Sequence, residues 1–259
     1  MILSNYHTHT THCDGQNDAE EMVLQAIGMG FRELGFSGHS HTFFDERYCM
    51  SPASTAAYKN QIRSLKAAYG DRLRIRLGVE QDFYSEAPTD DYEFIIGSVH
   101  YVKKDGLYLE VDWTRERQLE IVEDHYGGDF YSYIEDYFAT VAQVYEKTRC
   151  HIVGHFDLVK KFNKDGDLFD PRHPRYVAAE QKALKALLAA PVALEINTGG
   201  IAKGCLEDTY PGEAVIRQWL QAGKQVCFCS DCHDAAKLLA GRALFECYVA
   251  PENRDFLLP

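Results

Sequence analysis

Short apolar runs alternate with longer segments of helical periodicity along the whole chain. The runs are four to eight residues long and bounded by turn residues, which is typical of strands buried on both faces. The expected strands cover residues 2–7, 33–38, 73–80, 93–99, 150–154, 192–197 and 225–230, and the expected helices cover residues 18–29, 52–69, 114–125, 129–148, 173–190 and 211–222. This alternation predicts an α/β fold with a parallel sheet and helices packed outside it. Seven strands in this order favour a closed or nearly closed barrel over an open sheet.

Helix boundaries have their own signals. Ser51 followed by Pro52 is typical of an N-cap and a first helical position. Asp18 precedes two glutamates, which places carboxylates in the first turn of the helix expected over 18–29. Pro211 can begin the helix expected over 211–222.

Composition limits the class of protein. The 259 residues are 46% hydrophobic and 25% charged, which suits one barrel domain over residues 1–259. The formal net charge of −12 and the absence of a basic stripe argue against nucleic acid or an anionic membrane as partner. Residues 1–6 are too short for a signal peptide and no apolar run approaches membrane-spanning length, so we expect a cytoplasmic protein with reduced cysteines.

Metal-type side chains stand where the expected strands end. His7 and His9 are two residues apart on an extended segment, so both imidazoles point to the same side. Residues of the same kind close or follow the other strands: Asp14, His39, Glu80, His100, His155, Asp231 and His233. The carboxyl ends of parallel barrel strands share one mouth, so we expect these nine side chains to converge there.

Imidazole and carboxylate ligands suit divalent transition metals. Nine ligands are too many for one ion and enough for two or three, and Glu80 can bridge a pair. Three divalent ions would leave the site with a net positive charge before water binds. Such a site suits a phosphate dianion, although the chain as a whole is acidic.

Seven segments, in order along nearly the whole chain, resemble those of a known family. They are Tyr6-His7-Thr8-His9-Thr10, Gly38-His39-Ser40, Gly78-Val79-Glu80, Gly97-Ser98-Val99-His100, Gly154-His155-Phe156-Asp157-Leu158, Leu194-Glu195-Ile196-Asn197-Thr198 and Ser230-Asp231-Cys232-His233. The chain resembles the PHP (polymerase and histidinol phosphatase) superfamily, and within it the histidinol-phosphatase branch. This resemblance implies a distorted (β/α)7 TIM-like barrel with a trinuclear site for divalent transition metals (zinc, manganese or iron).

The resemblance also implies a ligand set and a reaction. His7, His9, Glu80 and Asp231 would hold the first ion, Glu80, His100 and His155 the second, and Asp14, His39 and His233 the third. The implied reaction is hydrolysis of L-histidinol phosphate to L-histidinol and phosphate, in which a hydroxide held between metals attacks phosphorus. Glu80 and Asp231 are then expected to serve catalysis as well as metal binding.

Several residues allow two interpretations. His12 stands near Asp14 and could replace it at the third ion, and His41 is either a substrate contact or a general acid. Lys160 and Lys161 are candidate phosphate contacts, or solvated loop charges. Asn197 either contacts substrate or caps the turn before Gly199.

Two rival functions remain open at this point. One is a phosphoesterase of the same superfamily acting on another small phosphate monoester, such as a nucleotide or sugar phosphate. The other is a non-catalytic metal-binding module, which the complete set of nine ligand-type residues disfavours. The sequence leaves the oligomeric state open.

Overall fold

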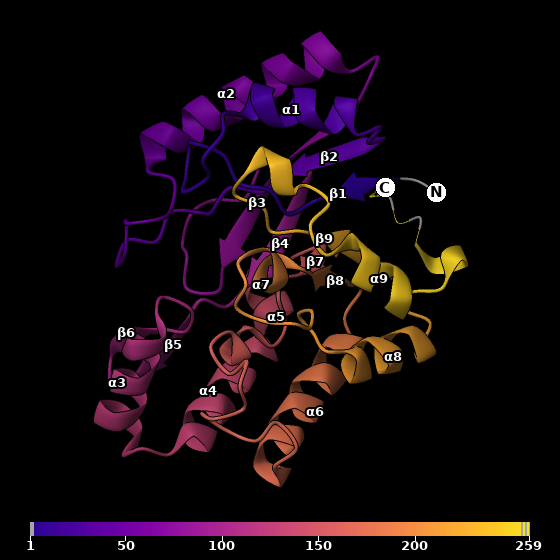
Figure 1. Ribbon diagram of the computed structural model, residues 1–259. Coiled ribbons are helices and arrows are strands. Elements are labelled where there is room, and N and C mark those ends of the chain that lie inside the picture. The colour runs from indigo at the N-terminus through magenta and orange to yellow at the C-terminus, as the bar shows by residue number, and fades with distance from the viewer. Residues whose placement is uncertain (1–2, 255, 257, 259) are drawn as a thin grey trace.

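The computed structural model describes residues 3–254, 256 and 258. Seven strands form one parallel sheet in the order β1-β2-β3-β4-β7-β8-β9. Their bounds are β1 (Ser4–Asn5), β2 (Glu33–Phe36), β3 (Arg74–Asp82), β4 (Phe94–Ser98), β7 (Ile152–Val153), β8 (Ala193–Asn197) and β9 (Val226–Cys229). All seven expected strands are present, most of them shorter than expected, and the expected start at Ile2 lies outside the described residues. Figure 1 shows helices packed around this sheet.

The first and last strands approach each other and nearly close the sheet into a barrel. Beyond β1 and β9, Thr8 pairs with Cys232 in a parallel bridge. The backbone N–H of His9 donates to the carbonyl of Cys232 at 3.0 Å. This confirms the expected distorted barrel and brings the segments that follow β1 and β9 side by side.

The helices surround the barrel. They are α1 (Ala19–Gly28), α2 (Pro52–Tyr69), α3 (Arg115–Tyr126), α4 (Phe130–Val141), α5 (Val144–Thr148), α6 (Pro174–Leu188), α7 (Gly199–Ala202), α8 (Glu213–Gln221) and α9 (Arg242–Tyr248), with short 3₁₀ turns at Leu158–Lys160, Ala235–Lys237 and Pro251–Asn253. Ser51 caps α2 through Ser54 N–H, and Asp18 caps α1 in a capping box with Glu21, as the sequence indicates. No helix in the described part of the chain is both long and apolar enough to cross a membrane.

Two expected helices differ from the structure. The single helix expected over 129–148 is two helices, since α4 ends at Val141 and α5 begins at Val144; α4 packs against α6, whereas α5 packs against β4. The helix expected from Pro211 begins at Glu213, with Gly212 in extended backbone as its N-cap. The expectations of one long helix and of a start at Pro211 were therefore wrong.

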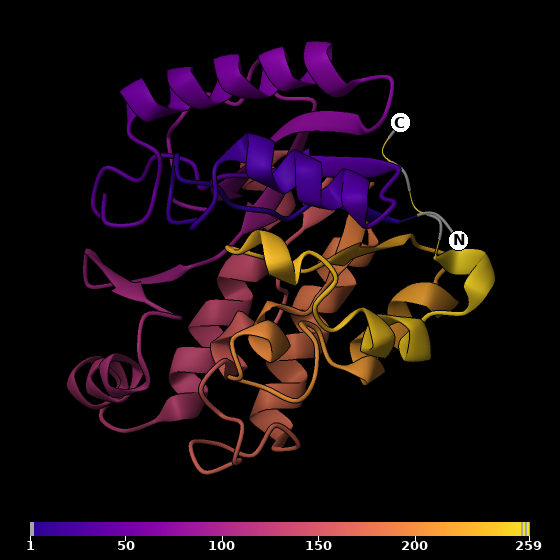
Figure 2. The ribbon, with the colours of Figure 1, turned by 45° about the horizontal axis from the view of Figure 1, so that its top comes forward.

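Residues 101–110, outside the expected elements, form an antiparallel hairpin of β5 (Tyr101–Lys104) and β6 (Leu107–Glu110). Its two-residue turn, Asp105-Gly106, has positive φ at both positions, as type I′ turns require. The hairpin extends away from the barrel (Figure 2). It leads directly into a wall of the cavity described below.

Two hydrophobic clusters follow the alternation of the strands. The larger cluster lies between sheet and helices, and the smaller one fills the barrel with Tyr6, Phe94, Ile96, Ile152, Ala193, Cys227, Cys229, Phe256 and Leu258. A Cβ atom at Gly78 would overlap the ring of Phe94, so the glycine makes room for this interior ring. All eight cysteines are free, and Cys227 and Cys229 pack in the interior.

Candidate metal centre

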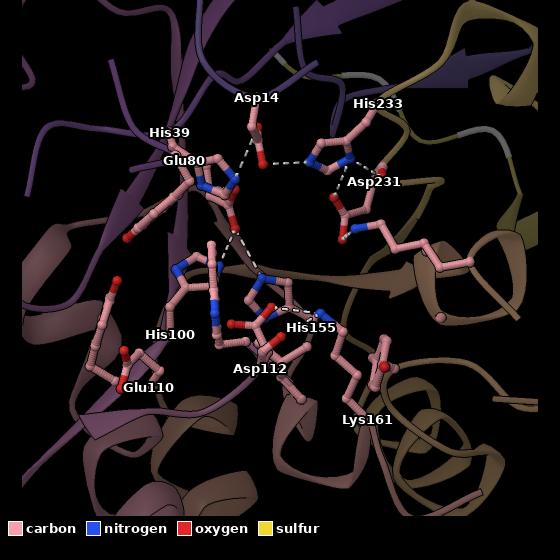
Figure 3. Close-up of a pocket in the computed structure, with 18 of the residues that line it drawn as sticks. Asp14, His39, Glu80, His100, Glu110, Asp112, His155, Lys161, Asp231 and His233 are labelled. Atoms are coloured by element: carbon pink, nitrogen blue, oxygen red, sulfur yellow. Dashed lines mark hydrogen bonds and ion pairs between the residues drawn. The ribbon is translucent and has the colours of Figure 1, made fainter. Parts of the chain in front are cut away.

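Nine ligand-type side chains gather at the carboxyl ends of the strands. Seven of them, Asp14, His39, Glu80, His100, His155, Asp231 and His233, line a cavity of about 390 Å³. His7 and His9 lie beneath them and are fully buried. Figure 3 shows the labelled members of the set pointing toward a common space. The structure thus brings together every residue expected as a metal ligand.

Glu80 stands at the centre of the cluster, with its two carboxylate oxygens facing different histidines. Oε1 lies 2.9 Å from Nε2 of His155 and 3.2 Å from Nε2 of His100. Oε2 lies 3.0 Å from Nε2 of His7 and 2.9 Å from Nδ1 of His39. A carboxylate with partners on both sides has the geometry of a bridging ligand.

The other contacts extend the cluster on either side of Glu80. Oδ1 of Asp231 lies 3.3 Å from Nε2 of His9 and 3.8 Å from Nε2 of His7. Oδ2 of Asp14 lies 3.1 Å from Nε2 of His233, and its Oδ1 lies 3.6 Å from Nε2 of His39. His9 stands between the two sides, since it neighbours both Asp231 and Asp14.

Buried polar atoms without hydrogen bonds show whether the cluster is suited to bind a metal ion. Nε2 of His7, Nε2 of His9 and Oε2 of Glu80 are buried, and none of them makes a hydrogen bond in the described structure, although Nε2 of His7 and Oε2 of Glu80 lie 3.0 Å apart. Buried polar atoms without partners are costly, and a cation at this point would satisfy all three. The ligand atoms of His7, His9 and Glu80 lie within 4.8 Å of one another, as do those of His9, Asp14, His39 and His233, and those of His39, Glu80 and His100. The donor set suits divalent metal ions.

The electrostatics favour ionised carboxylates and a neutral His9. Burial raises the pKa of Glu80, but His7, His39 and His100 outweigh it and hold the pKa well below its usual value. Burial raises the pKa of Asp231, which Lys203 and His7 outweigh in the same way. Burial, followed by His233 and His39, lowers the pKa of His9 to about 3. Ionised carboxylates and neutral imidazoles are the forms that bind metals.

The backbone at Asp231 is strained. Its φ is 47°, in the left-handed region that residues with a side chain rarely adopt. A Cβ atom at Gly199 would lie 2.8 Å from Oδ2 of Asp231, so only glycine leaves space for this carboxylate. Such strain is held at functional sites when the surrounding structure fixes it.

A second layer orients the histidines. Oε2 of Glu195, from β8, lies 2.8 Å from Nδ1 of His7, and Oδ2 of Asp82 lies 3.2 Å from Nδ1 of His100. Metal-binding histidines are commonly held in this way by carboxylates. Strand-end reasoning missed both residues, although a charged residue inside a strand buried on both faces, as at Glu195, was an available signal.

His12 and Asp14 differ in their position relative to the cluster. Nε2 of His12 lies 2.7 Å from Oε1 of Gln61 on α2, so the ring is engaged away from the cluster. Asp14 contacts His39 and His233, which are cluster members. The geometry therefore favours Asp14.

Three expected substrate residues are not at the cavity. Nε2 of His41 lies 2.7 Å from Glu46 on the exposed side of its loop, and the ring lines a separate groove with Ser40 and Phe43. The Lys160 ammonium contacts Asp157 at 2.7 Å and the Thr209 carbonyl at 2.9 Å. Other groups hold both of these side chains outside the lining of the cavity, so their positions do not support a contact with substrate there.

Asn197 is the third of these residues. It is fully buried, donates to Oε1 of Glu195 at 2.8 Å and accepts from the Gly199 N–H at 2.7 Å. It thus caps the turn before Gly199, which was the alternative interpretation, and it also fixes Glu195.

Lys161 does line the cavity, and it is joined by Lys203, which the sequence pattern did not single out. Nζ of Lys161 lies 3.0 Å from Oδ2 of Asp112, and Nζ of Lys203 lies 4.0 Å from Oδ2 of Asp231. Figure 3 shows Lys161 approaching Asp112 below His155. Two ammonium groups at the edge of the cluster make the cavity suitable for an anion.

The chain is similar to known proteins over most of its length. The family model of the PHP domain matches residues 5–199, so Asp231 and His233 lie outside the matched segment. A histidinol-phosphatase of Bacillus subtilis is 29% identical over 260 residues, which cover 88% of this chain and 92% of that protein.

Two solved structures share the fold. One, of a Listeria monocytogenes protein assigned to the histidinol phosphatases, has a TM-score of 0.79 at 22% identity and covers 94% of this chain and 100% of that chain. The other is histidinol phosphate phosphatase of Lactococcus lactis in complex with zinc, L-histidinol and phosphate. It has a TM-score of 0.66 at 21% identity and covers 95% of this chain and 93% of that chain. With the family model covering most of the chain and the fold shared, the chain belongs to the PHP domain family.

Proposed function

We propose that this protein is a metal-dependent phosphomonoesterase that hydrolyses L-histidinol phosphate to L-histidinol and phosphate. The observation that carries the proposal is the cluster of nine ligand-type side chains with Lys161 and Lys203 at its edge. The name of the Bacillus subtilis relative and the ligands of the Lactococcus lactis structure support the choice of substrate.

We assign three divalent ions to the cluster, on the number of its ligands and on the ligand sets that the resemblance to the PHP family implies. Glu80 separates one group from another, and its two oxygens face His7 and His39 on one side and His100 and His155 on the other. The proposed sets are His7, His9, Glu80 and Asp231 for the first ion, Glu80, His100 and His155 for the second, and Asp14, His39 and His233 for the third. When bound, such ions supply Lewis acidity toward phosphoryl oxygens and an activated water.

Residues around the cluster bind the substrate or hold the ligand side chains in place. The Lys161 and Lys203 ammonium groups add positive charge beside the cluster, where a phosphate dianion would lie. Glu195 and Asp82 hold the rings of His7 and His100 in place, so the donor atoms are preorganised. The substrate class is therefore a small phosphate monoester, and the metal is zinc, manganese or iron on the preference of this donor set.

The test is a panel of phosphate monoesters with metal-loaded protein. L-Histidinol phosphate, nucleoside monophosphates and sugar phosphates are compared by kcat/KM. We expect L-histidinol phosphate to exceed the others by at least about tenfold, a difference of about 1.4 kcal/mol in transition-state binding. A preference for another ester would overturn the named substrate and leave the class, whereas fully metallated protein without any phosphatase activity would indicate a non-catalytic module.

A further inference from the structure

The last residue of β6 and the segment that follows it contribute carboxylates to the wall of the cavity that also holds Lys161. Glu110, Asp112 and Trp113 all line the cavity, although none stands at the end of a barrel strand. A carboxylate beside a phosphate site is electrostatically unfavourable unless a positive charge pairs with it. The question for each carboxylate is therefore which positive group it pairs with.

Glu110 is already paired with two guanidinium groups. Its Oε1 lies 2.9 Å from Nη2 of Arg47, and its Oε2 lies 3.1 Å from Nε of Arg117. Arg47 also covers the ring of Trp113, with 4.1 Å between the guanidinium carbon and the ring centroid. Oε1 of Glu110 thus holds the hairpin against the loop that carries Arg47, and Oε2 holds it against α3 through Arg117.

Asp112 is engaged on one side only. Its Oδ2 and its backbone carbonyl both accept from the Lys161 ammonium, at 3.0 Å and 2.7 Å, whereas no contact of its Oδ1 is found in the described part of the structure. The side chain is 30% exposed and faces the cavity. Of the five carboxylates that line the cavity, Asp14, Glu80 and Asp231 belong to the cluster and Glu110 is paired with arginines. Asp112 is the one with an oxygen left for a ligand.

The backbone that carries Asp112 is fixed to the cluster. The N–H of Val111 donates to the carbonyl of His100 at 2.8 Å, and the Val111 carbonyl accepts from the Gln118 side chain at 3.2 Å. Val111 and Gln118 are both buried. Asp112 is therefore held beside a cluster residue on a backbone with little freedom, and Figure 3 shows its carboxylate near the ring of His155.

The proposed substrate has its charge in a matching place. In L-histidinol phosphate two carbon atoms separate the ester oxygen from the amine, which is protonated at neutral pH. A carboxylate that binds this ammonium must stand at the edge of the cluster rather than at the far end of the cavity. Asp112 satisfies that condition, because the backbone beside it is hydrogen-bonded to His100, whereas both oxygens of Glu110 are already paired with arginines.

We propose that Asp112 is a specificity-determining residue, whose free Oδ1 binds the protonated amine next to the scissile ester and so selects phosphate esters of amino alcohols. The inference rests on the proposed function and deepens it. The same side chain has a second task through Oδ2, because it positions Lys161 for the phosphate. The two tasks predict different responses to substitution.

The experiment compares two substrates in two variants. L-Histidinol phosphate and its amine-free analogue, imidazolylpropanol phosphate, are assayed with wild type, Asp112→Asn and Lys161→Met. Loss of a charge-assisted hydrogen bond in Asp112→Asn should reduce the ratio of kcat/KM values for the two substrates by about tenfold or more. Lys161→Met should lower kcat/KM for both substrates and leave their ratio unchanged, because both carry the same phosphate.

Control variants distinguish three effects of an Asp112 substitution: loss of selectivity for the amine, misplacement of Lys161, and damage to the fold. Glu110→Gln, on the same wall, should leave the ratio of kcat/KM values for the two substrates unchanged. Asp112→Glu should keep part of the preference for L-histidinol phosphate. If Asp112→Asn is inactive, calorimetry can measure the binding of L-histidinol and of imidazolylpropanol in the presence of inorganic phosphate. The ratio of the two dissociation constants then replaces the ratio of kcat/KM values. An equal loss for both ligands in Asp112→Asn would overturn the inference and reduce Asp112 to a positioning residue. A wild-type enzyme that does not prefer L-histidinol phosphate over unrelated esters would instead overturn the proposed function.

Discussion

Oε2 of Glu195 lies 2.8 Å from Nδ1 of His7, and both side chains are fully buried. The carboxylate fixes one ring nitrogen as the hydrogen-bonded one and leaves Nε2 of His7 directed at Glu80, 3.0 Å from its Oε2. Burial lowers the pKa of His7, but Glu80, Glu195 and Asp231 outweigh it and raise the pKa well above its usual value. A metal ion bound to Nε2 of His7 would take the place of the proton that this raised pKa favours on the ring.

Replacing Glu195 with Gln should weaken the metal centre without removing a ligand. The neutral amide orients His7 less strictly and lowers its basicity, so metal affinity or activity should fall by roughly 10–100-fold. Metal titration of the apoprotein, followed by the phosphatase assay, measures both. Unchanged affinity and activity would show that the contact is only structural.

Glu80→Gln should disturb more than one ion, because its carboxylate faces His7 and His39 through one oxygen and His100 and His155 through the other. We expect activity to fall at least about 100-fold and elemental analysis to show loss of more than one equivalent of metal. His125 lies on the last turn of α3, and His125→Ala serves as the matched histidine control. This variant should keep both its activity and its metal content. Full metal content in Glu80→Gln would contradict a bridging role.

Asp14 and His12 make a second comparison. Asp14→Asn removes a carboxylate that contacts His39 and His233, so the metal content should fall by one equivalent and activity should drop sharply. His12→Ala removes only the contact with Gln61 and should keep the metal. The opposite pattern, with metal lost in His12→Ala and kept in Asp14→Asn, would show that His12 is the ligand.

Glu180 on α6 predicts a pH dependence of stability. Burial, followed by the charge of Asp157, raises the pKa of Glu180 to about 7. The folded state therefore holds a proton between about pH 4.5, the usual value, and pH 7, and its stability decreases as the pH rises through that window. Glu180→Gln should then stabilise the protein at pH 8 and have little effect at pH 4.5. Urea denaturation of wild type and variant at both pH values measures this, and an equal difference at the two values would argue against a raised pKa.

Much of the fold and the cluster could be predicted from the sequence. Buried strands in an α/β alternation favour a parallel barrel, whose strand ends share one mouth, and His7 and His155 do lie close together although they are far apart in the chain. The bounds of α2, Pro52–Tyr69, followed directly from its capping residues.

What escaped prediction depends on the direction of side chains outside the barrel strands. Lys160 and Lys161 are adjacent, yet Asp157 and Thr209 hold the first away from the cavity while Asp112 holds the second at its wall. Asp112 and Lys203 lie on the segment after a hairpin and on the turn after the short helix α7, where apolar periodicity carries no signal. The Asp105-Gly106 pair was a usable sign of that hairpin.

The most direct test of the account is phosphate release from L-histidinol phosphate by purified protein, measured before chelation, after removal of its metals and after their return. We predict that chelation lowers the rate at least about 100-fold and that zinc or manganese restores it, with full activity near three equivalents per chain. A rate that is unchanged when elemental analysis shows the metals to be gone would contradict the assignment of this cluster as the catalytic centre.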